Sequence, residues 1–491
     1  MPTIRPWEKY REWCREYRSD VVFVHLPMQP TLILGSATAA FDLLDKRSNI
    51  YSDRIVSHML DLMGWGFDFV FMRYSQRWRT HRRMFRQQFH QDVVAKYRPV
   101  QLQQARVCLL SILTSPQYTR KHARLYVTST IFYVTYGKKI TSMDDEYVRI
   151  AQIALEGGSI ASIVGAFWIE YLPILRHIPT WVPGTVSMKT IAKYRPYLMD
   201  MVNKPFEEVK IALSSGTATP SVATTLLEQV RSDHEGTAEE AYYEEVAKNV
   251  TGIAYGGTQL TTSACESFLL AMVLFPDIQK KAQAELARVV ARTRLPEFDD
   301  IDDVPYIRAL VMETMRWMPV TPFGVPHATI SEDEYHGYHI PKGTMILPNI
   351  WAMLHDPQDY RDPDQFKPER FIGKDGKMDS SVRDPTTISF GFGRRICPGR
   401  HFSQNTLSIF IASVLHVFDI TPGVDASGKL VVLTDEMEGG LIAMPRTVPC
   451  GLKPRSEQAA HLVREAAADG AVLDSLLAPL VVTSSPADCG T

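Results

Sequence analysis

The stretch at residues 390–400, FGFGRRICPGR, is the most informative part of the sequence. Its glycines at 391, 393 and 399 permit tight turns and a close approach of the backbone to a flat group. Pro398 and a helical pattern follow Cys397, so a thiolate there would lie at a helix N-terminus, which favours an anion. Arg395 adds positive charge two residues earlier. An isolated cysteine in such a loop is more often an inert buried thiol, so the rest of the chain has to decide between the two interpretations.

Length and composition limit the possible architectures. At about 150 residues per domain, 491 residues correspond to about three domains or to one unusually large one. The hydrophobic content of 45% is ordinary for a globular protein, and the net charge of -2 gives no footprint for a nucleic-acid partner. The six cysteines form no CxxC pair, which is typical of a reducing compartment; they stand at positions 14, 108, 265, 397, 450 and 489.

The order of predicted elements favours one mainly α domain with a minor β-sheet. Residues 21–27 and 31–36 predict a β-hairpin, followed by a helix over 37–46 with Ser36 as its cap. A second β-leaning region covers residues 326–347. Because mainly helical sequence separates the two β-leaning regions, they can share a sheet only if the chain folds as one unit. The apolar run at 408–418 predicts a buried helix.

The spacing around the cysteine identifies a family. Phe390, Gly393, Arg395, Cys397 and Gly399 match F-x-x-G-x-R-x-C-x-G, which resembles the haem-binding signature of the cytochrome P450 superfamily. The resemblance implies that Cys397 is the proximal thiolate ligand of the iron in haem b. It also implies that Phe390 packs beside the ligand and that Arg395 reaches a haem propionate. A thiolate donates electron density to iron and favours O–O cleavage.

Two further motifs follow in the order in which the family has them. Glu313 and Arg316 resemble the E-x-x-R helix, and residues 368–371, PERF, resemble the segment that contributes a second arginine, here Arg370. The resemblance implies that Glu313, Arg316 and Arg370 form a charged triad that supports the haem-binding core. The spacing of three residues places Glu313 and Arg316 on one face of a helix, which such a pair requires.

Candidate partners for the haem propionates lie upstream and downstream of these motifs. Trp78 and Arg82 resemble the W-x-x-x-R of the family's third helix, whose two side chains meet a propionate. The guanidinium of arginine suits a carboxylate because its N–H groups form a fork. His327 falls where many relatives place another propionate partner.

The central helix departs from the family pattern. It is predicted to run from about residue 243 to 275, and its motif position reads GGTQLT, so Gln259 and Leu260 replace the usual acid and threonine. Gln cannot ionise and Leu cannot donate a proton. Three interpretations stay open: a one-residue shift gives the role to Thr261, water or a substrate hydroxyl supplies the proton, or the enzyme runs a peroxide-driven reaction or a rearrangement. The glycine pair at 256–257 fits close approach to a cofactor or a local kink.

The resemblance implies a haem-thiolate monooxygenase, an oxidoreductase that inserts one atom of O₂ into an apolar small molecule of secondary metabolism. Electrons would come from NADPH through a separate NADPH–cytochrome P450 reductase, since the chain shows no G-x-G-x-x-G between a strand and a helix. Arg79, Arg83, Arg394 and Arg400 are candidates for a basic docking face. The alternatives are a haem-thiolate peroxygenase, isomerase or dehydratase, and a non-catalytic haem protein. We expect a monomer without nucleic acid.

By the same resemblance, mostly apolar side chains from several parts of the chain line the substrate pocket. Phe323 and Leu260 are expected near the iron, and Leu441 in a turn that closes the pocket. An apolar pocket binds apolar substrates and excludes water. The contributing segments are residues 55–71, 167–168, 254–260, 320–325 and 439–442.

The resemblance covers residues 5–456, and the segments DLLDKRSNIYSDR and WRTHRRMFRQQF resemble the fungal group described as O-methylsterigmatocystin oxidoreductase-like. We therefore predict a haem-thiolate catalytic domain over 1–456 and a C-terminal extension over 457–491. The extension consists of a short amphipathic helix and a partly disordered tail. No apolar run is long enough for a membrane helix and no signal peptide is visible, so the chain as given is expected to be soluble. A native anchor in the endoplasmic reticulum membrane, on its cytoplasmic face, stays open.

Overall fold

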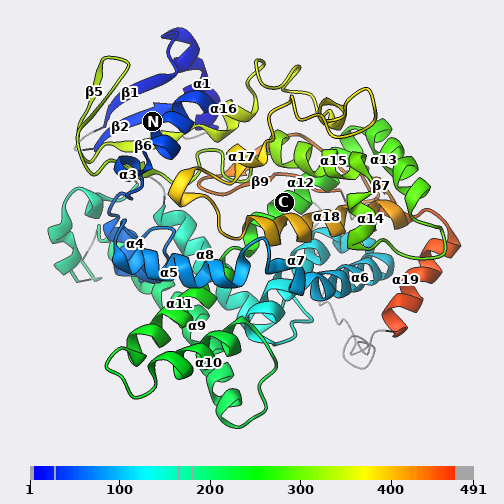
Figure 1. Cartoon of the computed structure of the whole chain (residues 1–491), viewed down its shortest axis with the longest axis horizontal. Helices are drawn as coiled ribbons and strands as arrows, with labels where there is room; N and C mark the ends of the chain where they lie inside the picture. The colour runs from blue at the N-terminus through cyan, green and yellow to red at the C-terminus, as the bar shows by residue number, and fades with distance from the viewer. Residues whose placement is uncertain are drawn as a thin grey trace.

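A four-stranded sheet joins the two β-leaning regions of the sequence. Its order is β1-β2-β6-β3, and its strands are Val21–Leu26 (β1), Gln29–Leu34 (β2), Met345–Pro348 (β6) and His327–Ala328 (β3). β1 and β2 form the predicted antiparallel hairpin, and β2 pairs in parallel with β6, with Leu32 opposite Ile346. Figure 1 shows this sheet at the upper left, where dark-blue strands from the start of the chain lie beside a yellow-green strand. The chain therefore folds as one unit.

Helices form most of the rest of the molecule, so the predicted mainly α fold is confirmed. The computed structural model describes residues 5–26, 29–162, 166–179, 181–182, 184–425, 427–449 and 451–469. Besides the five helices α6, α7, α12, α15 and α18, which are described below with the largest core, the α-helices are α1 (Pro6–Glu16), α2 (Ala37–Ala40), α3 (Ser48–Tyr51), α4 (His58–Met63), α5 (Gln76–Phe89), α8 (Glu146–Ala161), α9 (Val186–Ser214), α10 (Val222–His234), α11 (Glu240–Gly256), α13 (Pro276–Val289), α14 (Phe298–Asp302), α16 (Ile350–Leu354), α17 (Thr386–Ser389) and α19 (Glu457–Asp469).

Short elements connect these helices. A π-helix, η1 (Phe41–Lys46), continues α2, whose cap is the side chain of Ser36, as predicted. The 3₁₀ turns are η2 (Trp65–Phe67), η3 (Val94–Tyr97), η4 (Pro116–Tyr118), η5 (Trp168–Glu170), η6 (Pro173–His177), η7 (Pro368–Phe371) and η8 (Gly393–Arg395). The two-stranded pairs are β4 (Asp333–Tyr335) with β5 (Tyr338–Ile340), β7 (Phe418–Thr421) with β10 (Gly451–Pro454), and β8 (Met437–Gly439) with β9 (Ala443–Pro445).

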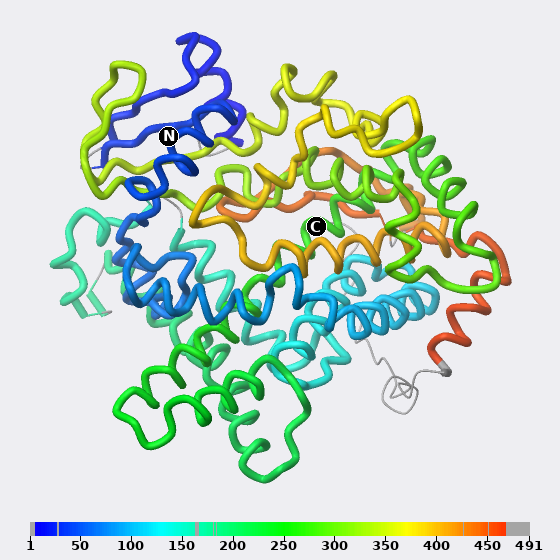
Figure 2. The backbone as a smooth tube through the Cα atoms, in the orientation of Figure 1, coloured from blue at the N-terminus to red at the C-terminus, as the bar shows by residue number. Residues whose placement is uncertain are grey.

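The largest hydrophobic core lies where α12 crosses its neighbours. α12 (Thr258–Leu274) is buried at almost every position from 261 to 272, which is typical of a helix enclosed on all sides. It packs with α6 (Arg98–Thr114), α7 (Thr119–Tyr136), α15 (Pro305–Trp317) and α18 (Arg400–Val417). α18 contains the helix predicted at 408–418 up to Val417, and Phe418 begins strand β7. In Figure 2 its orange trace runs beside the blue trace of α6, and Gln101 Nε2 donates to Phe402 O and Thr406 Oγ1.

The central helix is interrupted, whereas one continuous helix was predicted. α11 ends at Gly256 and α12 begins at Thr258, with Gly257 between them at φ -69° and ψ -3°. The hydroxyl of Thr258 donates to the carbonyl of Tyr255 at this break. Glycine lowers helix stability, so the break falls on the pair that the sequence marked as a kink or a close approach.

The end of the chain packs onto the main core. α19 buries Ala459 and Val463 in the same cluster as α6 and α18, and it is the short helix predicted after residue 456. The predicted tail at 470–491 lies outside the described residues, and the domain boundary at 456 stays a prediction. Among the described residues no single helix is long and apolar enough to cross a membrane. One bent pair passes by length and composition alone: Glu240–Leu274 with Pro276–Val289, at 107°.

Candidate functional site

The loop that carries Cys397 is closed by backbone hydrogen bonds. Cys397 N donates to Phe390 O over 2.8 Å, and α18 begins at Arg400, so the thiol lies just before a helix as predicted. Burial raises the pKa of the Cys397 thiol, while the N–H of Gly399 and the charges of Arg82 and Arg400 lower it. A thiol with a raised pKa is neutral, and coordination to a metal ion is what deprotonates such a group outright.

Arg395 does not supply the charge beside the thiol, contrary to the sequence interpretation. Its guanidinium donates to three backbone carbonyls, Ser52 O at 2.8 Å, Phe69 O at 2.9 Å and Met72 O at 2.7 Å. It also lies 4.5 Å above the ring of Trp78. Burial lowers the pKa of Arg395 to about 9. The side chain therefore fastens the segment after η2 to the cysteine loop.

Three arginines form a buried basic cluster around this loop. Arg54, 6% exposed, donates to Val70 O, Val325 O and Pro326 O, and Arg82 donates to Ile396 O. Burial lowers the pKa of Arg54 well below its usual value and that of Arg82 to about 10, and the charge of Arg395 contributes to the effect on Arg54. The neighbouring carboxylate of Asp53 is occupied by Arg73 and by the N–H of Tyr74. Buried charges of one sign are costly unless an opposite charge joins them.

The side chains that face this cluster suit a carboxylate ligand. Trp78 Nε1 is buried and has no hydrogen-bond partner among the described residues. Trp78 and Arg82 stand one turn apart on α5, whose first turn is capped by Ser75. An unpaired indole N–H beside guanidinium groups provides donors and positive charge together, which is what a buried propionate needs.

His327 lies at the edge of the cluster in strand β3. Its Nδ1 is 2.8 Å from the carbonyl of Tyr51, and because a carbonyl only accepts, Nδ1 carries the proton. Burial and the charges of Arg54 and Arg395 lower the pKa of His327 well below its ordinary value. In the neutral ring Nε2 is an acceptor, so it donates to a propionate only when the ring is protonated.

Arg54 is the residue of this cluster that the sequence analysis missed. It follows the SD of the YSDR segment at 51–54, and no spacing in the sequence connects it to the cysteine. Its carbonyl partners belong to two distant segments, which only the folded chain brings together. The sequence offered one signal, a charged residue immediately before the stretch at 55–71 that is predicted to line the pocket.

The structure brings the predicted charged triad together. Arg316 Nε and Nη2 donate to the two carboxylate oxygens of Glu313, each over 2.8 Å, and Arg370 Nε donates over 3.1 Å. Glu313 and Arg316 are fully buried. The remaining N–H groups of Arg316 donate to the carbonyls of Leu354, Pro363 and Gln365. Every donor of this guanidinium is therefore matched, which a buried ion pair requires.

Gly393 approaches protein backbone rather than a flat cofactor. Its φ is +50°, and a Cβ placed there would be 2.2 Å from Leu44 O in the π-helix η1. Only glycine fits that conformation and that contact. Gly399 differs, because a Cβ there would meet only Phe85 Cζ, at 4.0 Å. Phe390 is partly buried and packs against the main core.

The hydroxyl groups after the helix break already have partners. Thr261 Oγ1 lies 2.9 Å from Ser403 Oγ on α18, so Thr261 faces the helix that follows Cys397. Thr258 donates to the carbonyl three residues earlier, and Thr262 to the carbonyl four residues earlier. Gln259 and Leu260 are partly exposed.

The two other predicted pocket residues lie in different surroundings. The ring of Phe323 packs against Trp7 and Tyr10 of α1, with ring centroids 5.9 and 5.3 Å away. This packing favours a structural role over the predicted position near the iron. Leu441 is partly buried in the turn between β8 and β9, and Ala443 N donates to Val320 O over 2.8 Å. That turn is therefore next to the segment after the triad helix.

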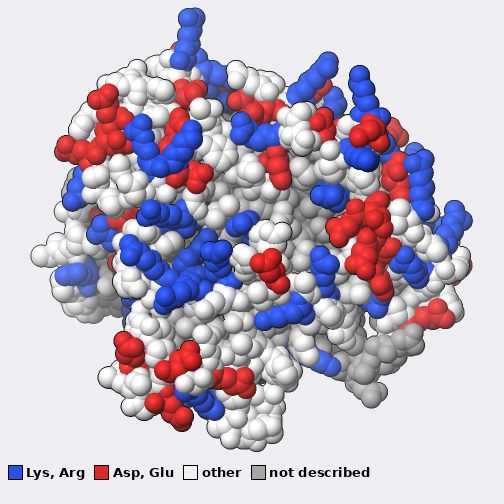
Figure 3. Space-filling view, in the orientation of Figure 1, with Lys and Arg blue, Asp and Glu red and all other residues white. Residues whose placement is uncertain are grey.

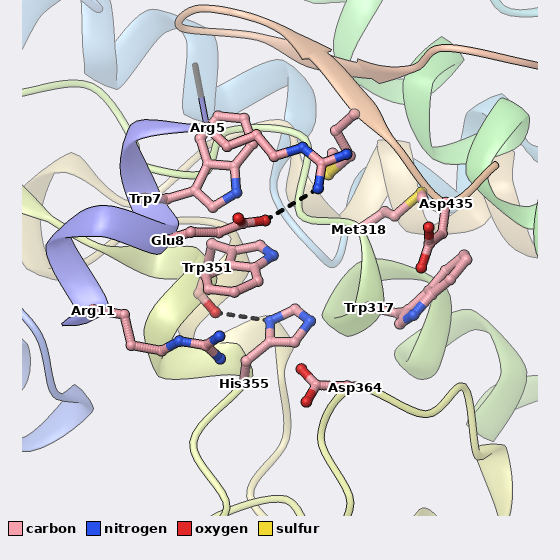
Figure 4. Close-up of a pocket in the computed structure, with 11 residues that line it drawn as sticks. Arg5, Trp7, Glu8, Arg11, Trp317, Met318, Trp351, His355, Asp364 and Asp435 are labelled. Carbon is pink, nitrogen blue, oxygen red and sulfur yellow. Dashed lines mark hydrogen bonds and ion pairs between the residues drawn. The ribbon is translucent and has the colours of Figure 1, made fainter. Parts of the chain in front are cut away.

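A separate cavity of about 350 Å³ lies between α1, the end of α15 and α16. Figure 4 shows Trp351 and His355 stacked in it, with Arg11 over Trp351 and Asp364 below His355. Its lining contains none of the predicted site residues. It is therefore distinct from the cysteine loop.

The structure is a mainly helical protein in which a buried cysteine thiol lies beside a cluster of basic side chains. The family model described as Cytochrome P450 matches residues 3–433. The chain therefore belongs to the cytochrome P450 family, and it is a monooxygenase of the oxidoreductase class. Proteins of this family bind haem b through a cysteine thiolate, and the residues described above fit that group.

Known proteins resemble the chain over most of its length. It is 40% identical over 466 residues to cytochrome P450 monooxygenase ple1 of Rhodocybe pseudopiperita, covering 94% of this chain and 88% of that protein. It is 36% identical over 461 residues to tryptamine 4-monooxygenase of Psilocybe cyanescens, covering 93% and 90%. It is 38% identical over 467 residues to cytochrome P450 monooxygenase 98 of Postia placenta, covering 94% and 89%. The predicted family is confirmed.

Asp68 makes the stability of the site depend on pH. Burial raises the pKa of Asp68 to about 7. The hydrogen bond from Val70 N and the charge of Arg54 lower this pKa, but their effect is smaller. The pKa of Asp in an unfolded chain is about 3.9. Between about pH 3.9 and pH 7 the native state therefore binds more protons than the unfolded state, so the free energy of unfolding falls as the pH rises. Between about pH 5 and pH 8 the free energy of unfolding should fall by roughly 2–3 kcal/mol more in the wild type than in Asp68→Asn. Urea titrations at each pH measure this, and equal slopes for the two proteins would contradict it.

Proposed function

We propose that Cys397 is the thiolate ligand of the haem iron and that this enzyme hydroxylates an apolar small molecule of secondary metabolism. The observation that carries the proposal is the buried basic cluster beside the cysteine loop, with an unpaired Trp78 N–H at its edge. Haem b, when bound, supplies the activation of O₂; the overall change is R–H + O₂ + 2 e⁻ + 2 H⁺ → R–OH + H₂O. Arg54, Arg82 and Trp78 would hold its propionates, and Arg395 would orient the segment that carries them.

The reaction consumes two protons, and the central helix lacks the acid and the alcohol that usually deliver them in this family. Gln259 and Leu260 occupy the positions of the acid and the alcohol. The contact between Thr261 and Ser403 on α18 speaks against a one-residue shift that gives Thr261 the role. A proton delivered by water or by a substrate hydroxyl is therefore the interpretation that we favour.

A separate NADPH–cytochrome P450 reductase is the proposed electron donor. Figure 3 shows Lys and Arg side chains gathered over α5, left of the centre of the view. The exposed members are Arg77, Arg79, Arg83 and Arg86 of α5 together with Arg394 of the cysteine loop. A patch of one charge steers a partner with the opposite charge, so the docking face of the reductase would be acidic. We place the encounter at the cytoplasmic face of the endoplasmic reticulum membrane, on the family resemblance.

The alternative is a haem-thiolate peroxygenase, isomerase or dehydratase, which needs no reductase. The observation that favours it is the replacement of the usual acid and alcohol by Gln259 and Leu260. The test is a metabolite screen of the haem-loaded protein with reductase and NADPH, beside the same screen with hydrogen peroxide alone. Product only with NADPH and reductase supports the monooxygenase reaction that we propose. Product with peroxide alone at an equal rate assigns the chain to the alternative.

A double variant examines the relay in the same assay. Gln259→Asp combined with Leu260→Thr restores the usual pair, and it should raise the product formed per NADPH if the relay is merely weakened. Loss of product with a normal haem spectrum would mean that the native residues serve a different chemistry. The matched control is Gln259→Asp alone, which adds the acid without the alcohol.

A further inference from the structure

Asp68 carries a buried carboxyl group that makes no ion pair with the basic cluster. The residue lies at the end of η2 and is 9% exposed. Its Oδ1 accepts from Val70 N over 2.8 Å, whereas its Oδ2 has no hydrogen-bond partner among the described residues. An oxygen of a buried carboxyl that lacks a protein donor is costly unless a proton or a water molecule occupies it.

The loop that carries Asp68 is fixed between the basic cluster and the central helix. Arg54 Nε donates to Val70 O over 2.8 Å, so Val70 connects the guanidinium of Arg54 with the carboxyl of Asp68. On the other side the ring of Phe67 packs on α11, where a Cβ at Gly252 would be 3.3 Å from Phe67 Cε2. Gly252 lies about one turn before the break in the central helix. The carboxyl therefore lies where the cluster meets the helix whose usual acid is missing.

The charges around Asp68 permit both of its protonation states. Burial raises the pKa of Asp68 to about 7, while the charge of Arg54 and the N–H of Val70 lower it. Arg395 and Arg82 are the other cations beside this loop. Arg54 therefore stabilises the carboxylate when the proton leaves, and the propionates of haem b would favour the acid. A group whose pKa is close to the operating pH gives up and regains a proton readily.

We propose that Asp68 is a proton carrier of this enzyme, which gives the proton on its Oδ2 to water in the substrate pocket and regains a proton from solvent. Its role in the reaction rests on the proposed function, whereas the proton on Oδ2 does not. In this step the O–H bond at Oδ2 breaks, the proton passes to a water molecule, and the carboxylate stays beside Arg54. Uptake from solvent restores the acid, so solvent supplies the protons of the overall reaction. Asp68 thereby compensates for the acid and the alcohol that Gln259 and Leu260 replace.

The first experiment detects the proton on Asp68 by infrared difference spectroscopy of the full chain at acidic and alkaline pH. The wild type should lose the C=O stretching band of a protonated carboxyl with a midpoint at about pH 7. Asp68→Asn should lack this band, and its amide oxygen still accepts from Val70 N, so the fold should persist. The matched control is Asp61→Asn, which removes a carboxyl from α4 in the same pocket-lining segment and should keep the band. A band that remains in Asp68→Asn, or that is missing from the wild type, would overturn the proposal.

The second experiment times proton delivery in haem-loaded protein without substrate or reductase. Reduced protein is mixed with oxygenated buffer, and the return of the oxidised Soret spectrum is followed as a function of pH. In the wild type the rate should fall about tenfold from about pH 6 to about pH 8, because the protonated fraction of a group with a pKa of about 7 falls by that factor. Asp68→Asn should be several-fold slower at about pH 6 and should change less than twofold over this range. Asp68→Glu keeps the acid and should restore the pH dependence.

The outcomes separate this proposal from the proposed function. An equal pH dependence in the wild type and in Asp68→Asn would reject a role in proton delivery, even with the infrared band assigned to Asp68. The spectrum of the reduced protein with carbon monoxide, recorded first, tests the proposed function alone. If that spectrum lacks the band of thiolate ligation, the proposed function fails, and the infrared measurement still decides whether Asp68 holds a proton.

Discussion

Replacing Cys397 by alanine is expected to abolish the red-shifted Soret band that reduced, haem-loaded protein forms with carbon monoxide, together with all NADPH-dependent product formation. The band reports thiolate ligation, and Cys397 is the thiol that lies between the basic cluster and the start of α18. The measurement is the reduced-minus-oxidised spectrum under carbon monoxide.

Two other cysteines provide matched controls. Cys108 and Cys265 are buried in the main core, where burial raises the pKa of both thiols. Cys108→Ala and Cys265→Ala should retain the band, although each creates a small cavity that costs some stability. A folded Cys397→Ala protein that kept the band would reject Cys397 as the ligand. A band lost in all three variants would point to misfolding, which haem content and circular dichroism would detect.

Glu313→Gln is expected to lower the free energy of unfolding by about 3–5 kcal/mol and to leave most of the purified protein without haem. The glutamine lacks the charge that compensates two buried guanidinium groups, and Arg316 is fully buried. Lys367 N also loses a charged acceptor at 2.7 Å. Because the triad anchors the segment before the cysteine loop, the loss should spread to the haem site. Urea titration and the haem-to-protein ratio measure the two effects.

Glu266 allows a comparison at a second buried carboxylate. It is fully buried on α12 and pairs with Arg124 over 2.9 Å and with Arg120 over 3.2 Å. The side chains of these arginines are 35% and 21% exposed, so water can hydrate them once the charge is removed. Glu266→Gln should therefore destabilise less than Glu313→Gln and should leave the haem content near normal. Equal losses in both variants would show that the triad has no special connection to the haem site.

The fold and the cysteine loop were accessible from the sequence because their signals are local. The hairpin, the cap at Ser36 and the helix after Pro398 each depend on residues within about ten positions of one another. The triad was also accessible, since Glu313 and Arg316 are one helical turn apart. The sequence analysis marked the glycine pair at 256–257 as a possible kink but predicted one continuous helix. Two glycines permit a break in a helix and do not require one.

The partners of the charged side chains could not be predicted in the same way. Arg395 was expected at a propionate, which stays a prediction, and three of its five N–H groups donate to carbonyls of residues 52, 69 and 72 that the sequence did not indicate. Phe323 was expected near the iron, which stays a prediction, and its contact with Trp7 and Tyr10 of α1 was not expected. Both outcomes depend on which distant segments meet in the folded chain. Residue type limits what a side chain can bind, but it does not select among partners of equal chemistry.

The class of this protein follows from its amino-acid order alone, because one thiol in a spaced glycine-rich loop and an ordered series of motifs are encoded along the chain. How the site is held depends on the folded chain. Arg54 joins the basic cluster, Thr261 turns to Ser403, and Phe67 brings the loop of Asp68 onto Gly252 of the central helix. The physical reason is that a buried charge or hydroxyl takes the partner that packing delivers, and packing is settled by the whole hydrophobic core rather than by neighbours in sequence.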